Sequence, residues 1–147
     1  MALTAQRFEQ AAALGTGVQI TKFTIPYTEL TGVADTTATV PLFTLPANGV
    51  IFWARSKHSV AFAGPSISDA SFVVGKSGTT NWILTDLDID AAVADTTLVH
   101  LNGPTSTVGA AAVGIIATVG STGANLSVLT AGSVDVWICW FNPTTNV

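Results

Sequence analysis

The stretch VDVWICWF, residues 134–141, decides how the rest of this chain is interpreted. Successive side chains of an extended strand point to opposite faces. The stretch therefore has one face of Val134, Val136, Ile138 and Trp140, and a second face of Asp135, Trp137, Cys139 and Phe141. A strand at the surface of an antiparallel sheet normally has one apolar and one polar face. Because both faces are largely apolar here, the stretch predicts a core strand whose second face also needs cover.

The composition indicates a single globular domain that carries little charge. Its 147 residues are enough to bury a core. Hydrophobic residues make up 48% of the sequence and charged residues only 10%, against about 25% charged residues in an average soluble protein. From Thr96 to Val147 the only Asp, Glu, Lys or Arg is Asp135, and Thr, Ser, Asn and Gly supply the polarity.

Charge and hydropathy argue against several classes of protein. A net charge of −4 with five basic residues argues against a surface that neutralises nucleic-acid phosphates. The most apolar run, residues 108–120, is too short and too rich in glycine for a membrane span of about 20 residues. The opening MALTAQRFEQ lacks the basic and apolar regions of a signal peptide. We therefore expect neither nucleic acid nor a membrane as a partner.

Short apolar or alternating runs separated by turn residues predict an all-β chain. Asn48-Gly49, in the turn PANG between two apolar runs, predicts a hairpin. Pro41 inside its run predicts an edge strand or a bulge. We expect an antiparallel β-sandwich, of jelly-roll type, over residues 18–147. Its strands are expected near residues 18–25, 36–45, 49–60, 69–75, 81–89, 96–101, 110–120 and 124–141.

Residues 1–17 form a separate N-terminal arm. Thr4 is a suitable cap for a short helix over residues 5–14. The apolar stripe of this helix is weak, and a helix of this length is marginal in isolation. We therefore expect either a loose arm or a short helix that docks on another surface. Its contact residues would be Arg7, Phe8 and Leu14.

No stretch matches a catalytic or cofactor-binding motif. GKSG at 75–78 would need a glycine at position 70 to form a phosphate-binding loop, and Ala70 is there, so a hairpin turn is expected. His58 and His100 lack a zinc-binding spacing, and no nucleophile motif surrounds Cys139. We therefore predict no catalytic residue and no cofactor.

An acidic run, residues 84–90, is the candidate for a metal site. Asp86, Asp88 and Asp90 alternate with apolar residues, so a strand would place their carboxylates on one face, where they repel each other. Hard divalent cations favour such oxygen ligands, although Ala91 stands where a calcium loop needs glycine. The simpler interpretation is a solvated edge strand whose charges prevent unwanted pairing.

A second stretch, GVIFWARSK at 49–57, repeats the pattern of two apolar faces. One face is expected to carry Val50, Phe52 and Ala54, and the other Ile51, Trp53, Arg55 and Lys57. Large aromatic side chains bury about 150–250 Å² each, so exposing three of them would forgo about 10 kcal/mol, an upper estimate. Asp135 would pair with Arg55 or Lys57. The arm or a long loop is an alternative cover, but we expect an interface between subunits, formed by Trp53, Arg55, Asp135, Trp137 and Phe141.

Four segments resemble small virion proteins of tailed bacteriophages. They are FTIPYTELTGVADTTATVPLFTLPANGVI (23–51), FAGPSISDASFVVGKSG (62–78), LTDLDIDAAVADTT (84–97) and GANLSVLTAGSVDVWICW (123–140), and the likeness extends over most of residues 18–142. The resemblance implies a β-sandwich or jelly roll that decorates the capsid surface as a trimeric cement protein. Such a protein contacts the major capsid protein and is assembled in the host cytoplasm. The resemblance rests on the order of phrases and turns, and it supplies no functional residues.

Two other functions remain open. A tail-fibre or receptor-binding module would recognise surface glycans by stacking Trp and Tyr on sugar rings, with Asp86 or Asp88 as polar partners. A glycan hydrolase would need two carboxylates about 5–9 Å apart in a cleft, for which Asp86, Asp88 and Asp95 are the candidates. The low charge, the Thr-, Ser- and Gly-rich strands and the second apolar face favour instead a non-enzymatic subunit that is buried in an assembly.

Overall fold

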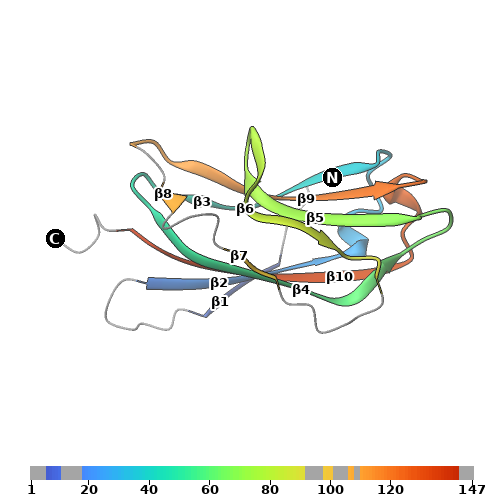
Figure 1. Cartoon of the computed structure of the whole chain (residues 1–147), viewed down its shortest axis with the longest axis horizontal. Coiled ribbons are helices and arrows are strands. Elements are labelled where there is room, and N and C mark those ends of the chain that lie inside the picture. Colours follow the sequence, from blue (N-terminus) through green and yellow to red (C-terminus); the bar gives the residue numbers. More distant parts are fainter. Residues whose placement is uncertain (1–5, 11–17, 92–97, 101–105, 108–109, 143–147) are drawn as a thin grey trace.

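The computed structural model of the chain describes residues 6–10, 18–91, 98–100, 106–107 and 110–142. They form two antiparallel sheets packed face to face (Figure 1), so the predicted β-sandwich is confirmed. Two short 3-10 helices, η1 (Tyr27–Glu29) and η2 (Leu126–Val128), are the helices of this part of the chain, and no helix there is long and apolar enough to cross a membrane. The strands are β1 (Gln6–Gln10), β2 (Val18–Pro26), β3 (Thr37–Leu45), β4 (Val50–Ala63), β5 (Asp69–Lys76), β6 (Thr79–Asp88), β7 (Leu98–His100), β8 (Ser106–Thr107), β9 (Val113–Thr122) and β10 (Ala131–Phe141).

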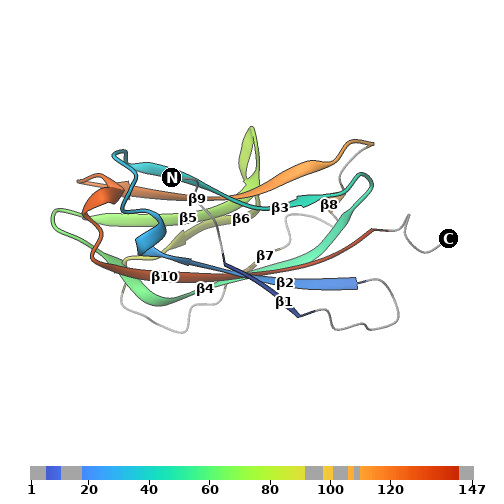
Figure 2. The same ribbon diagram turned by 180° about the vertical axis from the view of Figure 1, so that it is seen from behind.

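The chain crosses repeatedly from one sheet to the other. One sheet has six strands in the order β1-β2-β10-β4-β7, with β8 also paired to β4, and the other has four strands in the order β3-β9-β5-β6. The successive strands β2, β3, β4 and β5 alternate between the sheets. Seen from behind in Figure 2, β1 and β2 lie at one edge of the six-stranded sheet, and β10 lies next to β2 inside it.

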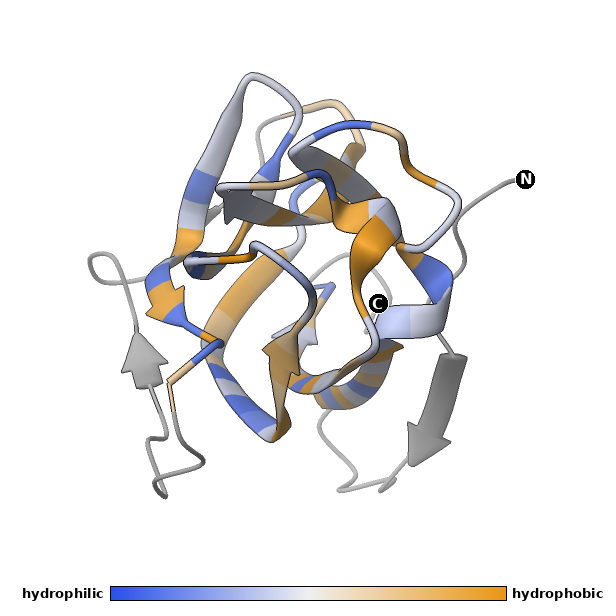
Figure 3. Cartoon of the chain, turned by 90° about the vertical axis from the view of Figure 1, so that its right-hand side faces the viewer, coloured by the Kyte–Doolittle hydropathy of each residue, from blue (hydrophilic) through white to orange (hydrophobic). Residues whose placement is uncertain are grey.

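The core lies between the sheets and follows the alternation of each strand. The inner face of β10 carries Val134, Val136 and Ile138, which are fully buried. An aromatic stack crosses the core at one side: the ring of Phe43 lies 5.8 Å from that of Phe23 and 5.5 Å from that of Trp140. Such pairs contribute about 0.5–1.5 kcal/mol beyond their buried area. In Figure 3 the two layers are seen end-on, with hydrophobic and hydrophilic residues alternating along the strands.

The PANG turn is present, but the predicted hairpin is wrong. Asn48 adopts a positive φ of 59°, and the Gly49 N–H donates to the Pro46 carbonyl at 2.9 Å. The strands on either side, β3 and β4, belong to different sheets and do not pair. An Asn-Gly turn reverses the chain locally, whereas the choice of strand partner depends on which apolar faces meet in the core. By contrast, GKSG does close a hairpin, because β5 and β6 pair on either side of it.

Pro41 lies where the sequence predicted it to lie. β3 is at the edge of the four-stranded sheet, and its register with β9 shifts between Pro41 and Phe43. Proline lacks the N–H that a central strand would donate to both neighbours, so it is tolerated at edges and bulges.

The predicted faces of the stretch 49–57 are wrong at its start because β4 contains a bulge. Cys139 pairs with Trp53 whereas Trp140 pairs with Ile51, so Phe52 is the extra residue in β4. A bulge inserts one residue and reverses the alternation beyond it. Ile51 is therefore buried in the core at 1% exposure, and Phe52, predicted to face the core, is 37% exposed.

The predicted N-terminal helix is also wrong. Residues 6–10 form β1, which pairs with β2 from Gln6 opposite Thr24 to Gln10 opposite Ile20. The free edge of β2 offers a row of unpaired backbone groups, whereas an isolated helix of ten residues gains too little to form. The expected boundary of the arm at residue 17 lies outside the described residues and stays a prediction.

Candidate functional site

The outer surface of the six-stranded sheet contains the residues that the sequence singled out for an interface. Trp53, Arg55, Asp135 and Trp137 lie together there, because Trp137 pairs with Arg55 and Cys139 with Trp53 in the β10–β4 register. Phe141 joins them at the end of β10. We call this surface the Trp137 face. Its members are Lys22, Thr24, Phe52, Trp53, Arg55, Lys57, Asp135, Trp137, Cys139 and Phe141.

Trp137 lies between two cations from neighbouring strands. Lys22 on β2 and Arg55 on β4 are its cross-strand partners. Lys22 Nζ is 5.2 Å, and Arg55 Cζ 5.5 Å, from the centre of the ring. Each cation–π contact of this kind contributes about 0.5–1 kcal/mol at an exposed site. Long cationic side chains also cover apolar surface with their methylene groups, so part of the cover for Trp137 comes from its own sheet.

Asp135 anchors one of these two cations. Its Oδ2 lies 3.0 Å from Lys22 Nζ, and its Oδ1 accepts a hydrogen bond from Thr24 Oγ1 at 2.6 Å. The prediction had given Asp135 either Arg55 or Lys57 as its partner. Lys57 is opposite Asp135 in the register with β4, and the structure shows an ion pair of Asp135 with Lys22 of β2. Sequence reasoning missed Lys22 because nothing in the order of residues says that β2 and β10 are neighbours.

Two phenylalanines form the apolar end of the Trp137 face. The rings of Phe52 and Phe141 stack with centroids 5.0 Å apart and an angle of 14° between their planes. The bulge in β4 brings Phe52 out to this position. Phe52 was expected in the core, so the face is more apolar at this end than the sequence predicted.

Cys139 is the most deeply buried residue of the Trp137 face. It is 4% exposed, and its burial raises the pKa of the thiol. Trp53, Trp137 and Phe141 are only partly buried. The second face of the opening stretch is therefore covered in part by its neighbours within the sheet, and part of its aromatic surface stays accessible.

The predicted arm residues lie partly within the structure. Arg7 and Phe8 belong to β1, where they are opposite Phe23 and Lys22 of β2 in the register. Leu14 lies outside the described residues. β1 thus continues the sheet that carries the Trp137 face.

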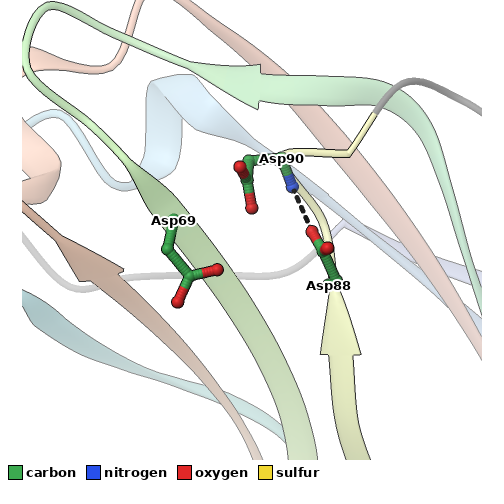
Figure 4. Close-up of side chains that lie close together, drawn as sticks. All are labelled: Asp69, Asp88 and Asp90. Carbon is green, nitrogen blue, oxygen red and sulfur yellow. Dashed lines mark hydrogen bonds between the residues drawn. The ribbon is translucent and has the colours of Figure 1, made fainter.

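A second candidate site is a group of three aspartates on the other sheet. Carboxylate oxygens of Asp69, Asp88 and Asp90 lie within 4.8 Å of one another. Asp88 ends β6, and Asp69 begins the neighbouring strand β5 (Figure 4). Two of the three metal candidates from the sequence, Asp88 and Asp90, therefore meet, whereas Asp86 is not a member and Asp69 takes its place. The sequence could not show this, because Asp69 reaches the group only through the β5–β6 pairing.

Backbone hydrogen bonds hold the acidic group in place. Asp88 Oδ1 accepts from the N–H groups of Asp90 at 3.2 Å and Ala91 at 3.0 Å, the first of which is drawn in Figure 4. Asp90 Oδ1 accepts from the Ala70 N–H at 2.8 Å. The bond from Ala91 is the main reason why the pKa of Asp88 is lowered, and burial is the main reason why the pKa of Asp90 is raised. The pKa values of these two neighbouring carboxyls are thus shifted in opposite directions.

The segment that follows the acidic group is tied to β4 by a buried histidine. His58 is 1% exposed, and its Nε2 lies 3.2 Å from the Ala91 carbonyl oxygen. The Phe62 N–H donates to the Ile89 carbonyl at 2.8 Å. These contacts explain why the chain leaves β6 in a fixed direction, and they place His58 in a structural role.

The chain is similar in fold to proteins of known structure. No family model matches the chain, and no curated protein matches it. A chain of the cyanophage Pam1 capsid asymmetric unit superposes with a TM-score of 0.64 and 16% identity, over 90% of this chain and 91% of that chain. A chain of the acidic stable capsid structure of Helicobacter pylori bacteriophage KHP30 gives a TM-score of 0.54 and 16% identity, over 95% and 94%. Because the identities are only 16%, these superpositions show that the three chains share a fold and nothing beyond that.

Proposed function

We propose that this chain is a non-enzymatic structural protein of a bacteriophage virion, which decorates the capsid surface as a symmetric oligomer. The observation that carries the proposal is that the two superposed chains both come from phage capsid structures, and that each matches this chain over nine-tenths of its length or more. The segments that resemble tailed-phage virion proteins support it independently.

The strand order also favours a virion protein. If β1 and β8 are set aside, the order β2-β10-β4-β7 faces the order β3-β9-β5-β6. We infer from this pattern of two four-stranded sheets with repeated crossings that the fold is a jelly roll, an architecture used by viral capsid domains.

We assign self-association to the Trp137 face. Trp53, Trp137 and Phe141 are partly buried in the single chain, and large aromatic residues that remain accessible are the usual energetic centres of protein interfaces. Asp135 and Arg55 belong to the same surface and would fix the register of the contact. Closure into a trimer about a three-fold axis would cover this face on every copy.

The N-terminal arm would carry attachment to the major capsid protein. Arg7 and Phe8 would contribute through β1 at the edge of the sheet, with Leu14 beyond it. One decoration trimer would then link neighbouring capsid subunits, and the added interface area would stabilise the shell.

Two measurements test this proposal. Light scattering after size exclusion should give three times the 15.1 kDa chain mass at all but the lowest concentrations. Sedimentation with shells that lack this protein should then show saturable binding, which deletion of residues 1–15 weakens while the domain stays folded. A monomer at every concentration would contradict the trimer. Failure of the full chain to bind shells would contradict the decoration function, and unchanged binding after the deletion would contradict the role of the arm.

A further inference from the structure

The hairpin between β5 and β6 stands out from the sandwich. In Figures 1 and 2 its tip extends beyond the four-stranded sheet, on the side away from the six-stranded sheet. The register explains this shape: Val74 pairs with Leu84, but two residues later Lys76 pairs with Thr79. Gly75 and Lys76 still pair with β9, and Ile83 is buried in the core at 3% exposure. The residues between them, 77–81, are exposed and form the part of the hairpin that projects beyond the sheet.

The hairpin is braced at its base. A Cβ atom added to Gly75 would lie 2.2 Å from the Thr79 carbonyl oxygen, so the two strands approach each other as closely as their backbones allow. Trp82 packs against the core, and Lys76 Nζ lies 4.6 Å from the centre of its ring. Gly78 takes a positive φ of 84° at the turn. The base is therefore held by backbone contact and by an anchored tryptophan, which favours one direction for the tip.

The tip presents hydrogen-bonding groups and no carboxylate. Its exposed side chains are hydroxyls and one amide, in Ser77, Thr79, Thr80 and Asn81. Exposed side chains of this kind contribute little to the stability of the chain that carries them. The hydroxyls and the amide can donate as well as accept, and the charge of residues 76–81 is the Lys76 ammonium, so the hairpin suits a partner surface rich in carbonyl and carboxylate oxygens.

We propose that the hairpin tip, residues 76–81, is a second contact with the shell, made to an oxygen-rich surface of a capsid subunit other than the one that the arm contacts. This inference rests on the proposed decoration function. A protein that links two shell subunits needs two separate contacts, and the structure places the hairpin and β1 on opposite sheets of the sandwich. The arm would attach the protein to one capsid subunit, and the hairpin would contact a second one, so that the protein links the two.

The test separates attachment from bridging. The variant S77A/T79A/T80A/N81A removes the polar groups of the tip, and T37A/T39A/T44A is its control, because these three threonines are exposed on β3 of the same sheet. Shells lacking the protein are saturated with each variant, and both bound copies and the melting temperature of the shell are measured. We expect the tip variant to bind about tenfold more weakly and, at saturation, to lose most of the thermal stabilisation of the shell. The control should match the unaltered protein.

Cross-linking identifies the partner without altering the whole tip. A photoreactive residue in place of Thr80 should cross-link to the major capsid protein in assembled particles, and the same residue in place of Thr39 should not. Full stabilisation of the shell by the tip variant, or cross-links only to sister copies, would overturn the inference and leave the decoration function standing. If the unaltered protein binds no shells, the decoration function itself fails.

Discussion

The two sheets pack on the same core, but their outer surfaces differ in chemistry. The Trp137 face of the six-stranded sheet combines stacked aromatic rings with Lys22, Arg55 and Lys57. The outer surface of the four-stranded sheet presents threonines on β3 and the carboxylates of the acidic group. A sheet that faces water carries mainly polar side chains outside, and the four-stranded sheet has threonines and serines there, beside the half-buried aliphatic residues Val73 and Ile116. The aromatic residues on the other sheet have a cost in water, which is why we propose that this surface is a contact surface.

The largest expected effect tests whether the Trp137 face is the contact surface. The variant W137A/F141A should remain folded but raise the dissociation constant of the oligomer by about 30-fold or more, since truncation of a central interface tryptophan typically costs at least about 2 kcal/mol. Light scattering over a dilution series measures it. Thr39→Ala, on the outer surface of the other sheet, is the matched control and should leave the mass unchanged. An oligomer that survives W137A/F141A at the same concentrations would remove the distinction between the two surfaces.

A smaller effect concerns the polar anchor of the same face. Asp135→Asn keeps an acceptor for the Thr24 hydroxyl but removes the ion pair with Lys22, whose side chain is 34% exposed. Because partly exposed ion pairs contribute about 0–1 kcal/mol, we expect a loss of this size in the free energy of unfolding, measured with urea at low salt. The loss should shrink at high salt, where the pair is screened.

A double-mutant cycle isolates this pair. Lys22→Gln and the combination with Asp135→Asn give the coupling energy between the two side chains. A coupling of zero would mean that Lys22 acts on this face only through its cation–π contact with Trp137.

The sequence predicted the strands better than it predicted their partners. Alternation places Val134, Val136 and Ile138 in the core, and the structure agrees because a two-residue period is a local property. The PANG turn was recognised, yet β3 and β4 pair with other strands, since strand pairing is decided by contacts distant in sequence. Residues 6–10 were predicted as part of a short helix from a capping signal. They form a strand instead, because the free edge of β2 offers partners for their backbone groups.

The candidate sites show the same limit. Trp137 and Phe141 followed from the pattern of β10, because both faces of a strand can be read from alternation alone. Phe52 was misplaced because a bulge leaves no clear mark in sequence. Lys22 and Asp69 were missed because each joins its group from a strand whose position depends on the fold, namely β2 beside β10 and β5 beside β6.

The smallest expected effect concerns the acidic group. Its neighbouring carboxyls, Asp88 and Asp90, should contribute in opposite directions to the change of folding stability with pH. The hydrogen bond from the Ala91 N–H lowers the pKa of Asp88, so the folded state favours its ionised form. The stability that Asp88 provides is therefore present at neutral pH and is lost as the pH falls through its folded pKa. Burial raises the pKa of Asp90, so the folded state disfavours its ionised form. The contribution of Asp90 is therefore full at low pH and is lost as the pH rises through its folded pKa.

Single amide variants separate the two carboxyls, since asparagine keeps the oxygen that accepts the backbone hydrogen bonds. Asp88→Asn should reduce the loss of melting temperature between neutral and acidic pH, and Asp90→Asn should increase it, as measured by circular dichroism at each pH. The acidic surface would then act as a set of individually tuned groups, unlike the Trp137 face, whose residues we propose to act through a partner. Shifts of the same sign in both variants would show that mutual repulsion dominates, and the local hydrogen bonds would not explain how this surface responds to acid.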